Sequence, residues 1–328
     1  MYRKAFVIAE IGCNHKGSMD VAREMIETAA VFCKVNAVKF QKRCIKELLT
    51  PEQYDAPHPD LHNSYGATYG EHREFLEFDL DQHRQLKEWC EEAGIIYSSS
   101  VWDMTSAKEI ASINPVFIKI PSASNNNDAM LEWLCNHYEG EIQVSFGMTT
   151  RKEEEHIVQL FEKNGRNKDL VILNCVSGYP VPFEDISLLE LNRMKEQYAG
   201  RVKKIGYSGH HLGIAVDMAA YTLGAEVLER HFTLDRTWKG TDHAASLEPD
   251  GMRRLVRDLE AVYKAMTVKT QEILPIEQPQ REKLKYRAAS TNLKCAIKQR
   301  GNEEKVERKA LSTIDFESAE ADMGYKNE

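Results

Sequence analysis

Short apolar segments alternate with amphipathic ones along most of the chain, and this alternation constrains the fold more than any other feature. Each strand-like run is followed by residues with the apolar spacing of a helix. The runs occupy residues 5–10, 36–41, 94–100, 116–122, 141–147, 170–177, 202–208 and 225–231. Because short hairpin turns are missing between them, we expect parallel strands joined by helices. Eight such units predict a closed (β/α)8 TIM-type barrel.

Residues with capping preferences mark several helix ends. Asp128 and Thr150 are suited to cap two helix N-termini, and Gly94 is suited to end another helix. A doubly wound open sheet is the alternative architecture, but its phosphate-binding motifs GxGxxG and GxxxxGK are absent from the strand–helix junctions. The barrel is therefore the favoured fold, with amphipathic helices expected at residues 18–34, 80–93, 126–137, 151–164, 184–198 and 248–266.

Two segments stand outside the repeat. Residues 42–79, after the second strand, form a loop too long for an ordinary connection, and such loops are often functional lids. Within it, His58, His62 and Arg73 either recognise a phosphate group or are solvated loop residues. The chain is expected to divide into a TIM-barrel domain and a short, charged C-terminal extension, residues 1–287 and 288–328.

Composition and charge exclude several classes of function. The formal net charge is −8 and no long basic run precedes the tail, so no nucleic-acid binding is expected. No apolar run approaches the roughly 18 residues of a membrane span, and the N-terminus lacks a signal-peptide pattern. The seven cysteines are scattered, which favours reduced thiols. We expect a cytoplasmic globular protein with no membrane segment.

Polar residues gather at the C-terminal ends of the predicted strands. In a parallel barrel these ends meet at one mouth, where the active sites of such folds lie. The side chains at these ends belong to Glu10, Lys39, Gln41, Ser100, Lys119, Ser122, Ser145, Asn174, Ser177, Tyr179, Ser208, His210, Glu229 and His231. Their number predicts a binding site for a polar ligand.

Lys39 and Lys119 each lie between two large apolar residues. An ammonium group is costly to bury without a partner, so each lysine needs a counter-charge. One interpretation is an ion pair with Glu10 or Glu229. The interpretation we favour is a binding site for a phosphate or carboxylate, because several hydroxyls share the same mouth.

His210 and His231 end the last two strands. Neighbouring parallel strands lie about 4.8 Å apart, so both imidazoles can reach one divalent metal ion. Imidazole ligands with water suit manganese, iron, cobalt or zinc. Asp242, in the loop after the last strand, is a further candidate ligand or base. The alternative is two unrelated histidines with separate partners.

Arg230 lies between two residues of the predicted mouth, Glu229 and His231. Because side chains alternate along a strand, Arg230 is expected to point the other way, toward the helices. There it should pair with an acid and have a structural role.

Ten stretches of the chain resemble the sialic acid synthase family. They follow one another in order across about residues 5–287, so the resemblance spans the predicted barrel. The stretches are IAEIGCNHKG (8–17), AVKFQ (37–41), SYGATYGEHREFLEF (64–78), SSSVWD (98–103), IKIPSAS (118–124), VSFGMTT (144–150), NCVSGYPVP (174–182), IGYSGHH (205–211), LERHFTLDRTWKGTDHAAS (228–246) and SLEPDGM (246–252).

The resemblance implies a TIM-type barrel, a homodimer and roles for residues singled out above. It implies a divalent metal at His210 and His231, with Mn²⁺ expected and Mg²⁺ or Co²⁺ as alternatives. The expected catalytic residues are Glu10, Lys119, His210, Glu229, His231 and Asp242. The expected substrate-binding residues are Lys39, Gln41, Ser100, Ser122, Ser145, Asn174, Ser177, Tyr179 and Ser208. Many family members end in an antifreeze-like domain, for which residues 288–328 are too short.

The implied function is a metal-dependent condensation of phosphoenolpyruvate with an open-chain aldose. The aldose would be N-acetylmannosamine or a related sugar, or its 6-phosphate, and the products a nonulosonic acid and phosphate. Glu10 and Glu229 are alternative bases for the water that adds. Three other readings stay open: another phosphoenolpyruvate-condensing barrel, an aldolase that forms a Schiff base with Lys39 or Lys119, and a degenerate, non-catalytic sugar-binding barrel.

Overall fold

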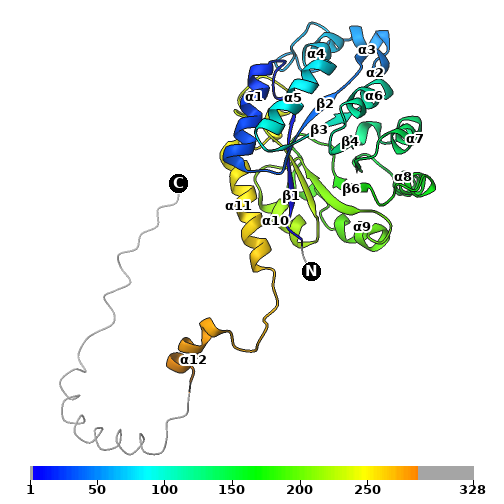
Figure 1. Ribbon diagram of the computed structural model, residues 1–328. Helices are drawn as coiled ribbons and strands as arrows, with labels where there is room; N and C mark the ends of the chain where they lie inside the picture. The colour runs from blue at the N-terminus through cyan, green and yellow to red at the C-terminus, as the bar shows by residue number, and fades with distance from the viewer. Residues whose placement is uncertain (1–2, 287–328) are drawn as a thin grey trace, which may run out of the picture. The chain divides into compact units, whose positions relative to one another are not determined.

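The computed structural model describes residues 3–286, and within this range the strands close into one parallel barrel (Figure 1). Each strand pairs with the next along the chain, and the last pairs with the first. The strands are β1 (Phe6–Gly12), β2 (Ala37–Lys42), β3 (Ile96–Val101), β4 (Phe117–Ile120), β5 (Glu141–Ser145), β6 (Leu170–Cys175), β7 (Lys204–Gly209) and β8 (Val227–His231). The predicted TIM-type barrel is confirmed.

Helices lie outside the strands in Figure 1. They are α1 (Met19–Glu27), which continues as the π-helical turn η1 (Thr28–Cys33), then α5 (Leu80–Glu92), α6 (Met104–Ser112), α7 (Asp128–His137), α8 (Arg151–Lys163), α9 (Glu190–Tyr198), α10 (Ala215–Thr222) and α11 (Pro249–Ala265). Short 3-10 turns are η2 (Ser122–Ser124), η3 (Phe183–Asp185) and η4 (His243–Ala245).

The predicted helix ends are mostly confirmed. Thr150 caps α8, and its side chain accepts a hydrogen bond from the amide of Glu153. Gly94 follows α5 with φ of +70°, a conformation that glycine adopts without strain. The prediction for α7 was wrong by one residue, because Asn127 accepts the capping hydrogen bond and Asp128 is the first helical residue.

Side-chain alternation divides the barrel wall into two faces. Inward-facing apolar residues fill one end of the barrel as a separate cluster: Ile8, Ala37, Phe117, Val171, Leu173 and Val227. Their outward-facing neighbours, such as Val7, Val38 and Ile172, join the larger core beneath the helices. Beyond the inner cluster, the inward positions are polar. Apolar side chains therefore fill the barrel at its N-terminal end, and the polar inward side chains lie toward the mouth.

Arg230 points outward from β8, as its place between Glu229 and His231 predicts. It is fully buried and pairs with Asp217 of α10 at 2.5 Å. Its guanidinium also donates to the carbonyl oxygens of His211 at 2.5 Å and Gly213 at 2.8 Å. The arginine thus fixes β8 to the loop that follows β7, and the predicted structural role is confirmed.

The segment expected as a long loop after β2 contains short helices. These are α2 (Ile45–Leu48), α3 (Pro51–Asp55) and α4 (Tyr69–Phe75), and both α3 and α4 begin with a capping box. The segment also contacts the loop after β8. Asn63 accepts a hydrogen bond from the amide of Gly240 at 3.0 Å, and Tyr65 donates to the carbonyl of Lys239. We call residues 43–79 the β2 insert.

The chain separates into two compact units, Met1–Met266 and Thr267–Glu328. The first holds the barrel, so this unit ends earlier than the expected boundary at residue 287. The described part of the second contains η5 (Pro275–Glu277) and α12 (Gln278–Leu284). The expected C-terminal extension, 288–328, lies outside the described residues. Among residues 3–286, no helix has the length and apolar character needed to span a membrane.

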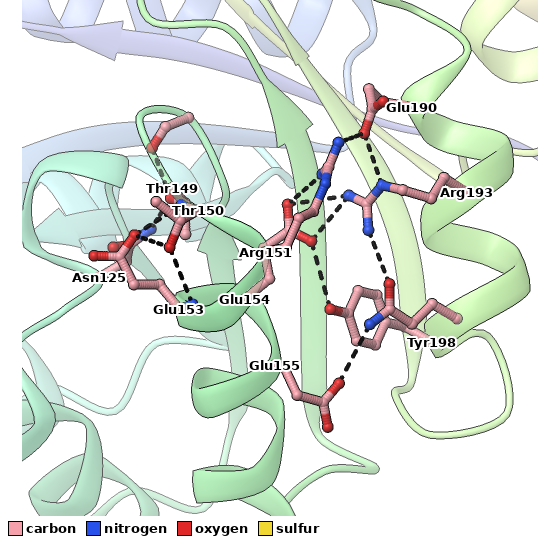
Figure 2. Close-up of polar contacts among 12 residues, drawn as sticks. Asn125, Thr149, Thr150, Arg151, Glu153, Glu154, Glu155, Glu190, Arg193 and Tyr198 are labelled. Atoms are coloured by element: carbon pink, nitrogen blue, oxygen red, sulfur yellow. Dashed lines mark hydrogen bonds and ion pairs between the residues drawn. The ribbon is translucent and has the colours of Figure 1, made fainter.

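A buried carboxylate joins α8 to α9 on the outside of the barrel. Figure 2 shows Glu154 between Arg151 and Arg193. Glu154 is 2% exposed and lies 2.8 Å from Arg151 Nη1 and 2.9 Å from Arg193 Nη2. Tyr198 donates a further hydrogen bond to it at 3.4 Å. Both arginines also contact Glu190, so the two helices share one ionic network.

We predict that Glu154→Ala lowers the free energy of unfolding by about 2 kcal/mol. Removing one partner of a buried ion pair leaves the other charges uncompensated, but hydration of the half-exposed Arg151 limits the loss. Urea denaturation would measure it, with Lys152→Ala, an exposed residue of the same helix, as the control. An equal effect of both substitutions would contradict the role of Glu154.

A second prediction concerns acid stability. His83 is fully buried, and burial, followed by the charge of Lys42, lowers its pKa from 6.5 to about 3. Between these pKa values the unfolded chain takes up a proton that the folded chain does not, so stability falls as the pH drops below 6.5. His83→Gln should remove about 1.4 kcal/mol of this loss per pH unit. Denaturant unfolding between pH 7 and pH 5 tests it, and identical slopes for both proteins would refute it.

Candidate active site

A cavity of about 290 Å³ opens at the mouth of the barrel. Most of the predicted site residues line it: Glu10, Lys39, Gln41, Ser100, Lys119, Ser122, Ser145, Ser177, Tyr179, Ser208, His210, Glu229 and His231. They come from all eight strand ends or the loops that follow directly. The structure therefore brings together residues that are up to 221 positions apart, from Glu10 to His231.

Two lysines and two glutamates form a buried charge cluster at the base of this cavity. Lys39 pairs with Glu10, and its Nζ also lies 3.7 Å from Glu229 Oε2. Lys119 Nζ donates to the same Glu229 oxygen at 3.0 Å. Glu229 thus bridges the two ammonium groups. The ion-pair interpretation of the lysines is confirmed, and the interpretation as a phosphate or carboxylate site stays a prediction.

Hydroxyl and amide groups complete the cluster. Lys39 Nζ lies 2.6 Å from Ser100 Oγ, and Ser208 donates to Glu229 Oε1 at 3.0 Å. The amide of Gln41 donates to Glu10 Oε1 at 2.8 Å. Each charged group therefore has a defined position, which is the condition for a preorganised polar site.

The two carboxyl groups differ in basicity. Burial raises the pKa of Glu10 above the usual range of a carboxyl, although Lys39 opposes the shift. Burial acts on Glu229 too, but the charges of Lys119 and Lys39 outweigh it and hold its pKa well below the usual range. Burial also lowers the pKa of Lys119, and Glu229 limits this effect. Glu10 is therefore the stronger base of the two.

Three serines line the wall formed by β4, β5, β6 and their loops, and a glycine lets two of them approach each other. A Cβ at Gly147 would lie 2.5 Å from Ser177 Oγ and 2.7 Å from Ser122 Oγ, closer than real Cβ atoms come. The Gly147 amide donates to Ser122 Oγ at 2.9 Å. With Ser145 nearby in the same wall, this arrangement presents hydroxyl donors beside Lys119.

The imidazoles of His210 and His231 lie together at the mouth, with ring centroids 5.4 Å apart. His210 Nδ1 is 2.8 Å from the carbonyl oxygen of Val176, which can only accept, so Nδ1 carries the hydrogen and Nε2 has a free lone pair. His231 Nδ1 makes no hydrogen bond within residues 3–286 and lies 3.7 Å from Asp242 Oδ2. Burial lowers the pKa of His231 to about 4, so its ring is neutral at pH 7.

These two imidazoles fit a divalent metal ion. Both present nitrogen lone pairs at one place, and the buried Nδ1 of His231 lacks a donor among the described residues. Burial lowers the pKa of His210, but the Cys175 side chain and the Val176 carbonyl outweigh burial and raise it, so a metal ion would compete with a proton for Nε2. Within residues 3–286, no group of three or more His, Cys, Asp or Glu side chains is arranged to hold a metal. Water and substrate would have to complete the coordination.

Two of the predicted residues lie outside the cavity wall. The described lining residues do not include Asn174, because alternation along β6 places Cys175 there instead. The substrate-binding role of Asn174 therefore stays a prediction without support from the cavity lining. Asp242 is also not among them, but it contacts His231 and lies at the rim.

Sequence reasoning missed the neutral part of the wall. Further lining residues are Trp102, Pro121, Ala123, Met148 and Cys175. The alternation of β6 could have indicated Cys175, since it follows the inward-facing Leu173 by two positions. The others follow strands as neutral loop residues within the stretches SSSVWD, IKIPSAS and VSFGMTT, so the family resemblance was the signal that could have indicated them.

Comparison with known proteins gives consistent results. The NeuB family model matches residues 25–271. N-acetylneuraminate-9-phosphate synthase of Homo sapiens is 39% identical over 279 residues, which cover 85% of this chain and 76% of the human protein. N,N'-diacetyllegionaminic acid synthase of Campylobacter jejuni is 31% identical over 265 residues, 80% of this chain and 78% of that protein.

A solved structure agrees as well. The N-acetylneuraminic acid synthetase of Leptospira borgpetersenii matches with a TM-score of 0.72 at 29% sequence identity, covering 87% of this chain and 94% of that one. The family model and the relatives agree with the residues found at the barrel mouth. The chain belongs to the NeuB family of sialic acid synthases.

Proposed function

We propose that this enzyme condenses phosphoenolpyruvate with an open-chain aldose to give a nonulosonic acid and phosphate. As a sialic acid synthase relative, it is a transferase that forms a carbon–carbon bond. The observation that carries the proposal is the Lys119–Glu229–Lys39–Glu10 cluster beneath serine hydroxyls and two imidazoles. The proposed acceptor is N-acetylmannosamine or a related sugar. Its phosphorylation is open, since only some relatives, such as the human synthase, have 9-phosphate in their names.

The reaction joins three molecules. Carbon 3 of phosphoenolpyruvate attacks the aldehyde carbon of the sugar, whose oxygen takes up a proton and becomes a hydroxyl, and carbon 2 gains positive character. Water adds to carbon 2 and loses a proton. The bond between carbon 2 and the phosphate oxygen then breaks, which gives the 2-keto acid and inorganic phosphate. The site must therefore hold a polyanion, orient an aldehyde and accept a proton.

Lys119 and the serine hydroxyls are proposed to bind phosphoenolpyruvate. The hydroxyls of Ser122, Ser145 and Ser177 lie on the same wall as Lys119 and can donate to carboxylate or phosphate oxygens. The two lysines are balanced by two glutamates, so this cluster alone brings no excess positive charge. A further cation at the mouth would balance the charge of the polyanion.

His210 and His231 would hold that cation, for which Mn²⁺ is proposed, with Mg²⁺ or Co²⁺ as alternatives. When bound, a divalent metal polarises the oxygen of an aldehyde as a Lewis acid. Tyr179 packs against both imidazoles, with ring centroids at 4.3 Å from His210 and 5.6 Å from His231. Its ring would limit access of water to this part of the mouth.

Glu10 is proposed as the proton acceptor. Its raised pKa makes it a better base than Glu229, whose two lysine neighbours keep it ionised. Glu229 is then a positioning residue that keeps Lys39 and Lys119 in place. The structure thus gives a reason to choose between two bases that the sequence left equal.

Membership of the NeuB family favours this reaction over a Schiff-base aldolase or a non-catalytic barrel. The homodimer implied by the resemblance and the cytoplasmic location stay predictions. The function itself is tested by incubating the full chain with phosphoenolpyruvate, Mn²⁺ and a panel of aldoses. Phosphate release together with a product of the expected mass is the required result, and phosphate release with no aldose would refute the proposal.

We predict that Lys119→Met lowers kcat/KM for phosphoenolpyruvate by about a hundredfold or more, the usual effect of removing one fixed donor from a charged site. Lys42→Met is the matched control, because Lys42 ends strand β2 of the same barrel and pairs with Glu109 at 3.3 Å instead of lining the cavity. Initial-rate kinetics with varied phosphoenolpyruvate measure the effect. A change confined to the KM of the sugar would contradict the assignment.

We also predict that His231→Ala weakens the binding of Mn²⁺ to the enzyme by at least tenfold, because one of two imidazole ligands is lost. Isothermal titration calorimetry measures this directly, without turnover. His211→Gln is the control, since the neighbouring His211 contacts Asp217 at 3.3 Å beneath the helices. Unchanged affinity in a folded His231→Ala protein would show that the metal does not bind there.

A further inference from the structure

A second cavity, of about 200 Å³, adjoins the active site and is lined by the β2 insert and two barrel loops. The insert contributes two arginines, a tyrosine and three aliphatic residues, and the loops after β3 and β4 contribute the rest. Its lining is Arg43, Ile45, Leu48, Leu49, Tyr69, Arg73, Trp102, Ala123 and Ser124. Trp102 and Ala123 also line the main cavity, so one elongated ligand can reach both.

Arg73 supplies the positive charge of this second cavity. Its Nε and Nη2 both donate to the hydroxyl of Tyr69, at 3.0 Å and 2.6 Å, and its guanidinium lies 5.0 Å from the centre of the Tyr69 ring. Within residues 3–286, Arg73 has no carboxylate within ion-pair distance. A half-buried guanidinium held by a neutral hydroxyl keeps its full charge available for an anion.

Arg43 is the second arginine that lines this cavity. It is 6% exposed, and its Nη1 donates to Glu77 at 2.8 Å. The guanidinium stacks 4.4 Å from the ring of Trp102, and its Nε is a buried donor with no hydrogen-bond partner among the described residues. Glu77 balances the charge of Arg43. Arg73 is therefore the lining residue of the second cavity whose positive charge is not balanced by an ion pair among the described residues.

The position of the second cavity distinguishes the two substrates. The serine wall and Lys119, proposed to bind phosphoenolpyruvate, belong to β4, β5, β6 and their loops. The arginines belong to the β2 insert, and Arg43 donates to the side chain of Gln41, which the family resemblance assigns to the acceptor sugar. The second cavity thus borders the sugar side of the mouth.

We propose that Arg73, supported by Arg43 and Tyr69, binds a phosphate group on the far end of the acceptor sugar. The enzyme would then use a phosphorylated aldose and release a phosphorylated nonulosonic acid. Arginine is the residue best suited to this role, because its planar fork donates two parallel hydrogen bonds to phosphate oxygens. The inference rests on the proposed condensation and adds the class of acceptor and the residues that select it.

The test compares N-acetylmannosamine with its 6-phosphate as acceptors, at saturating phosphoenolpyruvate and Mn²⁺. The unmodified enzyme should prefer the 6-phosphate by at least a hundredfold in kcat/KM. Arg73→Met should reduce this preference by about a hundredfold, through loss of turnover with the phosphorylated acceptor. Arg73→Lys, which retains a point charge, should keep more of the preference. Lys46→Met is the control, because Lys46 is an exposed residue of the same insert that does not line the cavity.

The outcomes separate this inference from the proposed function. Equal use of both acceptors by the unmodified enzyme would overturn the phosphate site and leave the condensation intact, and this result does not depend on any variant. An Arg73→Met protein that retains the preference would also overturn it. If the variant instead raised the KM of phosphoenolpyruvate, the arginine would bind the phosphate of that substrate. If the unmodified enzyme released no phosphate with either acceptor, the proposed function itself would be refuted.

Discussion

The active site depends on the bridge that Glu229 makes between Lys39 and Lys119. Each ammonium alone would be too costly to bury at the centre of a barrel, yet the site needs fixed positive groups near a polyanionic substrate. The carboxylate of Glu229 offsets the cost of burying both ammonium groups, because they lie 3.7 Å and 3.0 Å from one of its oxygens. The same pairing reduces the positive charge that the lysines offer to a substrate. Ser208 and Ser100 then fix the cluster from either side.

The barrel and the position of its site could be derived from the sequence because they follow from periodicity. Eight alternating units predict closure, and a period of two along each strand predicts which residues share a face. This reasoning placed Arg230 correctly beneath the helices. On β6 it indicates Cys175, two positions after the inward-facing Leu173, as a lining residue, because neighbouring strand residues point to opposite sides.

Other features were not accessible in the same way. The pairing of Lys119 with Glu229 joins residues 110 positions apart, and no local pattern specifies it. The order of basicity between Glu10 and Glu229 depends on these pairings and on burial. The helices of the β2 insert are a different case, because the capping boxes that begin at Thr50 and Thr68 are local signals that could have been found.

The β2 insert has a consequence for how enzymes of this kind can diversify. Residues 43–79 form one uninterrupted stretch of chain, and they contribute both arginines of the second cavity, while the serine wall comes from β4, β5, β6 and their loops. Exchanging this stretch between relatives could therefore transfer the preference for one acceptor sugar and leave the residues proposed to form the carbon–carbon bond unchanged. Recombination, as well as point mutation, becomes a plausible route to new nine-carbon sugars.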